Sequence, residues 1–173
     1  MEIEIVSSSG RRKRRPAAFL DCIAPLLVLE EVQRLDGFNQ HYNTSRLRHS
    51  LNVAYCGYVL SRALGLDFRA AARAGMLHDL FCYNWREEGH SASLHTYLHP
   101  KCALENAERL VHDLTDVERD AIAAHMWPLC DTRPHYMVSA VVSLADKICC
   151  VAEVAASGGR SCKRRVKKFF IVS

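Results

Sequence analysis

Six side chains of metal-binding types stand inside or at the ends of otherwise apolar segments. They are His49, His78, Asp79, His99, His125 and Asp146. Imidazole suits iron, manganese, nickel, cobalt and zinc, and carboxylates suit the harder divalent ions. Such groups are costly in a hydrophobic core unless they are paired. Their types and positions therefore predict a site for one or two divalent ions, drawn from Fe, Mn, Ni, Co and Zn.

Helix geometry brings some of these groups together. Adjacent residues of a helix point about 100° apart, so His78 and Asp79 in AGMLHDLF can flank one ion or bridge two. Arg46 precedes His49 by three residues and shares its helix face. A guanidinium beside metal ions is useful mainly when the substrate is an anion. This spacing therefore favours an acidic substrate.

The order of His49, His78, Asp79 and Asp146, within the segments RHSLNVA, AGMLHDLF and SLADK, resembles the HD-domain superfamily. These are metal-dependent phosphohydrolases named for the histidine–aspartate pair. The resemblance covers about residues 46 to 152 and implies that these four residues hold one metal.

A subset of that superfamily adds two histidines between the pair and the last aspartate, and this chain has His99 and His125 in that interval. The successive gaps are 29 residues from His49 to His78, 20 from Asp79 to His99, 26 to His125 and 21 to Asp146. They are similar to those of the two-metal members. The resemblance thus implies a second metal, with Asp79 as the bridging ligand.

The resemblance implies phosphomonoester or phosphodiester hydrolysis by a metal-activated water, with a nucleotide or small phosphorylated metabolite as substrate. The expected catalytic residues are Asp79, Arg46 and Lys147. Arg46 and Arg48 are expected to bind the phosphate, and His41 to line the pocket. Lys147 directly follows a ligand, so the alternative of a solvent-exposed lysine stays open.

Two other functions are compatible with the same residues. Some HD-domain proteins, resembling inositol oxygenase and a phosphonate-cleaving relative, bind two irons and use oxygen to cleave a carbon bond, and ligand identity does not separate them from hydrolases. A non-catalytic module that senses a nucleotide is the third hypothesis, kept open by the basic tail CKRRVKKFF.

Helical periodicity recurs through most of the chain, so we expect an all-α fold, a single helical bundle with the metal site in its core. Predicted helices cover about residues 16–34, broken near Pro25, then 45–64 with Asn43 or Thr44 as cap, and 67–80. Residues 81–98 are expected to form an irregular loop. Further helices are expected from His99–Pro100 to about 112, from the capping-box pair Thr115 and Glu118 to about 126, and over about 135–156.

The chain of 173 residues is long enough for one domain with a substantial core. We expect a basic N-terminal extension at 1–15, the HD domain at 16–157 and a basic C-terminal tail at 158–173. Basic clusters at 11–16 and 163–168 lack groove-binding motifs, so we expect no nucleic-acid partner. The eight cysteines are scattered, which predicts a reducing cytoplasm. No apolar run is long enough to span a membrane, so we expect no membrane partner. The substrate, the metal and the oligomeric state stay open.

Overall fold

The helical class predicted from the sequence is confirmed. The computed structural model describes residues 16–41, 44–82 and 92–158, without the side chains at 41, 92–95 and 157–158. The described part is an all-α bundle with one small antiparallel pair of strands. Its elements are α1 (Ala17–Leu27), α2 (Glu30–Arg34), the 3₁₀ turn η1 (Leu35–Gly37), β1 (Asn39–His41), β2 (Thr44–Ser45), α3 (Arg46–Ala63), α4 (Phe68–Leu77), α5 (Ala92–Leu110), α6 (Asp116–Ala124) and α7 (Met137–Gly158).

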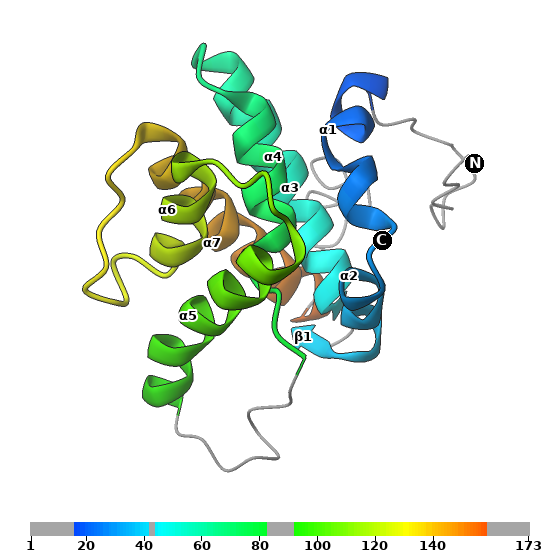
Figure 1. Ribbon diagram of the computed structural model, residues 1–173. Coiled ribbons are helices and arrows are strands. Elements are labelled where there is room, and N and C mark those ends of the chain that lie inside the picture. Colours follow the sequence, from blue (N-terminus) through cyan, green and yellow to red (C-terminus); the bar gives the residue numbers. More distant parts are fainter. Residues whose placement is uncertain (1–15, 42–43, 83–91, 159–173) are drawn as a thin grey trace.

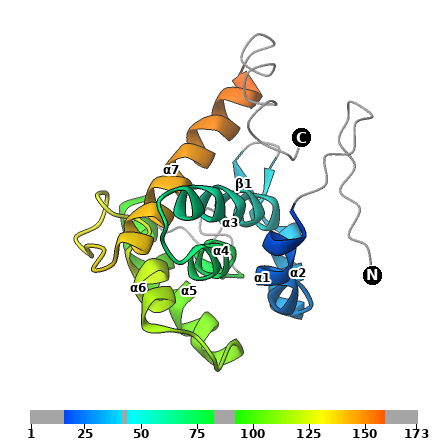
Figure 2. The same ribbon diagram turned by 90° about the horizontal axis from the view of Figure 1, so that it is seen from above.

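Helix α4 lies at the centre of the bundle. Every residue from 70 to 80 is buried. Helices α1 and α2 lie on one side of the α3–α4 pair, and α5 and α6 lie on the other (Figures 1 and 2). Four alanines in α4 and the absence of a side chain at Gly75 let neighbouring helices approach closely. The end of α4, where the histidine–aspartate pair stands, is therefore enclosed by the bundle.

Local capping determines where the two central helices begin. The Ser45 hydroxyl accepts a hydrogen bond from the Arg48 amide, and Asp67 accepts one from the Ala70 amide. Gly65, with φ of 68°, occupies the turn between the helices. Asp67 therefore caps α4, and the cap of α3 is Ser45 and not the predicted Asn43 or Thr44.

Helix α6 begins with the predicted capping box. The Thr115 hydroxyl accepts from the Glu118 amide, and the Glu118 carboxylate accepts from the Thr115 amide. The same carboxylate receives the guanidinium of buried Arg73 in α4. Arg73 also donates to Asp113 at 2.8 Å. These contacts fix α6 against the central helix and so place His125 at its far end.

Several predicted boundaries are wrong. Pro25 lies inside α1, and the interruption falls at residues 28–29. Helix α5 begins at Ala92, so the predicted loop over 81–98 is helical in its last part, and Pro100 lies in a helix interior. A proline removes one helical hydrogen bond and costs about 3 kcal/mol. Packing of the surrounding residues, such as Phe19 and Ile23 in α1, offsets that cost.

Other predictions fall outside the described residues. These concern the N-terminal extension at 1–15, the C-terminal tail beyond 158 and the part of the predicted loop at 83–91. Among the described helices, none combines the length and apolar character needed to cross a membrane.

Gly75 offers a direct test of the close α3–α4 contact. A Cβ atom there would lie 2.7 Å from Ala54 Cα and 2.9 Å from Ala54 N. Because backbone atoms of α3, and not the end of a flexible side chain, would have to shift, Gly75→Ala should destabilise the fold by about 1–3 kcal/mol in urea unfolding. In the control Gly57→Ala, the new Cβ would lie 3.4 Å from Ala71 O. That variant should change stability by less than about 1 kcal/mol, and equal effects of the two changes would contradict the close contact.

Candidate metal centre

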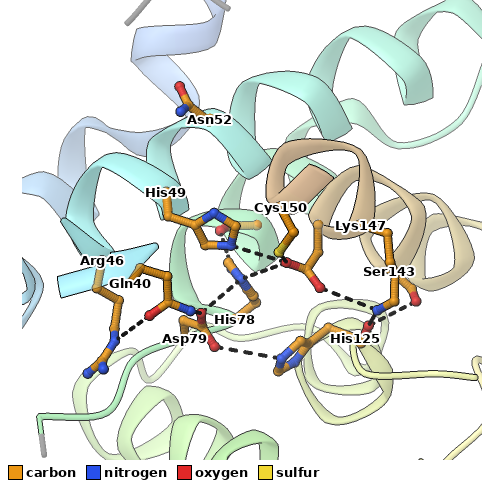
Figure 3. A network of polar contacts seen from close by, with 12 residues as sticks. Gln40, Arg46, His49, Asn52, His78, Asp79, His125, Ser143, Lys147 and Cys150 are labelled. Atoms are coloured by element: carbon orange, nitrogen blue, oxygen red, sulfur yellow. Dashed lines mark hydrogen bonds and ion pairs between the residues drawn. The ribbon is translucent and has the colours of Figure 1, made fainter. Parts of the chain in front are cut away.

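The structure brings the six predicted ligands together from five helices. His49 lies in α3, His78 and Asp79 follow α4, His99 lies in α5, His125 ends α6, and Asp146 lies in α7. None is more than 6% exposed. Figure 3 shows His49, His78 and Asp79 turned toward one another, with His125 on the other side of Asp79. Side chains separated by up to 97 residues therefore share one buried cluster.

The first half of the cluster surrounds one carboxylate oxygen of Asp146. His49 Nε2 lies 3.1 Å from Asp146 Oδ1, and His78 Nε2 lies 3.8 Å from the same oxygen. His78 Nε2 is also 3.4 Å from Asp79 Oδ2. His49, His78 and Asp79 offer ligand atoms within 4.8 Å of one another, so together they could hold one ion.

The second half of the cluster lies around Oδ1 of Asp79, whereas His78 faces Oδ2 of the same carboxylate. His99 Nε2 is 3.5 Å and His125 Nε2 is 3.7 Å from Asp79 Oδ1. The two Nε2 atoms are 2.9 Å apart. These three residues form a second group within 4.8 Å, and Asp79 belongs to both groups. The carboxylate of Asp79 is therefore placed to bridge two ions.

Hydrogen bonds at the far ring nitrogens orient two of the imidazoles. His78 Nδ1 lies 2.8 Å from the Gly75 carbonyl, and His125 Nδ1 lies 2.7 Å from the Ile122 carbonyl. Since a carbonyl only accepts, each Nδ1 carries the proton in the neutral ring, and each Nε2 turns a lone pair inward. His78 Nε2 and Asp79 Oδ1 are buried and have no hydrogen-bond partner. Lone pairs that point into the site, together with buried ligand atoms that have no hydrogen-bond partner, suit a divalent metal.

Glu153 was not predicted as part of the site. Its carboxylate lies 3.0 Å from His49 Nδ1 and accepts a hydrogen bond of 3.0 Å from the Asn52 amide. A carboxylate at Nδ1 directs the proton there and leaves Nε2 for a metal. The signal for it in the sequence was a second acid two turns after Asp146 on an otherwise apolar helix.

Arg46 acts on the site through a residue that sequence reasoning missed. Its Nε donates to Gln40 Oε1 at 3.0 Å, and the Gln40 amide donates to Asp79 Oδ2 at 2.6 Å. The guanidinium also donates to the Phe81 carbonyl and lies 3.6 Å from the Phe81 ring centroid. Arg46 is only 2% exposed. It is held against Gln40 and Phe81, and thereby orients the carboxylate of Asp79 through Gln40.

The other predicted substrate residues differ in position. Lys147 Nζ donates to the His125 carbonyl and lies 3.3 Å from Asp146 Oδ2, so it points into the site rather than away from it. Ser143 also donates to the His125 carbonyl, at 2.9 Å. Arg48 is partly exposed beside His49. The side chain of His41 lies outside the described part of the chain.

A thiol lies next to the first half of the cluster. Cys150 Sγ is 3.3 Å from Asp146 Oδ1, one helical turn along α7. Burial raises the pKa of this thiol to about 11, an effect that His49 opposes. Without a metal, the thiol is therefore protonated near neutral pH and donates to Asp146. No cysteine was among the site residues predicted from the sequence.

Electrostatics keep Asp79, Asp146 and His125 in the protonation states that metal coordination requires. Burial would raise the pKa of Asp79, but the imidazoles of His78, His99 and His125 hold it well below its usual range. His49 likewise lowers the pKa of Asp146 against the effect of burial. Burial, with the neighbouring His78 and His99, lowers the pKa of His125 to about 3. The carboxylates are thus ionised and His125 is neutral.

His49 is the exception among the imidazoles. Burial opposes its protonation, yet the contacts with Asp146, Cys150 and Glu153 raise its pKa well above the usual value. In the metal-free protein, a positive charge on the ring is therefore favoured. A divalent ion at Nε2 would supply that charge while Nδ1–H still donates to Glu153.

Comparison with protein-family models and with solved structures found no match.

Proposed function

We propose that the chain is an HD-domain phosphohydrolase that hydrolyses a phosphoester of a nucleotide or small phosphorylated metabolite. The observation that carries the proposal is the position of Asp79. Its two carboxylate oxygens face different sets of imidazole nitrogens, His78 on one side and His99 with His125 on the other. A carboxylate shared in this way could hold two ions close together, as the two-metal mechanism of phosphoester hydrolysis needs.

The first ion would be held by His49, His78, Asp79 and Asp146, and the second by Asp79, His99 and His125. When bound, the ions supply an activated water and neutralise the charge that develops on the phosphoryl group. The chain's own polar residues orient these ligands. Their contacts are Glu153 to His49, Gln40 to Asp79, and the Gly75 and Ile122 carbonyls to His78 and His125.

Lys147 is the best-placed cation for a substrate phosphate. Its side chain is 29% exposed, whereas that of Arg46 is buried against Phe81 and Gln40. An ammonium has three N–H donors, and the contacts to the His125 carbonyl and Asp146 use two of them. We assign the third to a phosphate oxygen. Arg46 is assigned to positioning Asp79 through Gln40.

Metal loading followed by a substrate screen tests the proposal. Protein purified without oxygen would be analysed for metal content, reloaded separately with Mn, Fe, Co, Ni or Zn, and assayed for phosphate release from nucleotides and sugar phosphates. We expect metal-dependent release that is lost in His125→Ala. It should be retained in His112→Ala, which removes an exposed histidine away from the site.

Two results would overturn the proposal. Two bound irons with oxygen uptake and no phosphate release would identify a di-iron oxygenase instead. Nucleotide binding without turnover under any of the five metals would identify a sensing module.

A further inference from the structure

Cys150, His49 and His78 all lie near the same carboxylate oxygen of Asp146. Asp146 Oδ1 lies 3.3 Å from Cys150 Sγ, 3.1 Å from His49 Nε2 and 3.8 Å from His78 Nε2. The ligand atoms of His49, Asp146 and Cys150 all lie within 4.8 Å of one another. That spacing suits three ligands of one ion.

The unpartnered nitrogen of His78 points to the same place. Its Nε2 is buried, has no hydrogen-bond partner and lies 3.8 Å from the oxygen that Cys150 contacts. An imidazole nitrogen without a partner in a buried site requires a cation or a proton donor. A cation bound near Asp146 Oδ1 would therefore be within reach of His49, His78 and the sulfur.

We propose that Cys150 is a sulfur ligand of the ion held by His49, His78 and Asp146. This inference rests on the proposed metal centre. A sulfur ligand would make that centre selective among divalent metals. Thiolate favours zinc, cobalt and iron, and it disfavours magnesium and manganese. On binding, the S–H bond breaks, a sulfur–metal bond forms and the proton leaves to solvent. Cys150 and Asp146, which share a hydrogen bond in the metal-free protein, would then bind the same ion.

A purely structural role gives a different expectation. If Cys150 only donates its S–H to Asp146, a serine hydroxyl can donate to the same oxygen, and Cys150→Ser should leave the metal environment unchanged. If the sulfur is a ligand, the serine variant should lose the sulfur signal and bind thiophilic ions more weakly.

Cobalt spectroscopy of the full chain separates these roles. Anaerobic Co²⁺ titration should produce visible d–d bands from the ligand set and a near-ultraviolet sulfur-to-cobalt charge-transfer band. We expect Cys150→Ser to lose the charge-transfer band while the d–d bands remain. The matched control Cys102→Ser changes a partly buried thiol on α5 and should keep both.

The outcomes distinguish this inference from the function on which it rests. Visible bands without a sulfur band in the wild type, or a sulfur band that survives in Cys150→Ser, would overturn the role of Cys150 and leave the metal centre intact. No cobalt binding at all would overturn both. Should Cys150→Ser fail to fold, X-ray absorption of the zinc-loaded wild type decides the question, since a ligating sulfur gives a shell at about 2.3 Å and nitrogen or oxygen at about 2.0–2.2 Å.

Discussion

Replacing Asp79 by asparagine should lower the metal content of both halves of the centre at once and reduce hydrolysis by more than about 100-fold. Changing a residue that only supports a metal ligand typically costs about 10–100-fold, so losing a bridging carboxylate should cost more. The reason is geometric, since Asp79 faces His78 through Oδ2 and His99 and His125 through Oδ1. Asparagine keeps the side-chain shape but removes the negative charge that two adjacent cations need.

Two matched variants test whether the loss of metal from both halves is caused by the shared position of Asp79. Asp146→Asn removes a carboxylate that contacts only His49 and His78 among the histidines of the cluster, so it should weaken the first ion alone. His125→Ala should weaken the second ion alone. Metal content by elemental analysis, together with phosphate release, measures all three. If Asp79→Asn lost no more metal than Asp146→Asn, Asp79 would not be the shared ligand.

Glu153 should control the affinity of the first ion without touching it. Glu153→Gln preserves an oxygen that can accept from His49 Nδ1 but removes the buried charge, and it should weaken metal binding by about 10–100-fold. Glu153→Ala should weaken binding further. It should also destabilise the metal-free fold by about 1–3 kcal/mol, because His49 and Asn52 each lose a buried partner.

Competition with a chelating dye measures the affinity, and urea unfolding of the metal-free protein measures the stability. Asn52→Ala is the control, since it removes one hydrogen bond to Glu153 and keeps the carboxylate on His49. Wild-type metal affinity in Glu153→Gln, with unfolding unchanged, would show that this charge does not act on the site.

The helical class, the capping box of α6 and the types and order of the buried ligands could all be predicted from the sequence. They are visible there because imidazoles and carboxylates are costly in apolar segments, and because a cap depends on residues only three positions apart. The boundaries near Pro25 and Pro100 could not be predicted in this way. Packing against other helices outweighs the local cost of proline at both positions.

Contacts between distant residues decided the rest of the site. Gln40 reaches Asp79 across 39 residues, and Glu153 reaches His49 across 104, so no local pattern reveals either contact. The sequence alone determined which residues could bind a metal. The tertiary structure decided that the six side chains meet, which nitrogens turn inward and that Cys150 lies beside them, because these depend on how the ends of α4 and α6 pack against α3, α5 and α7.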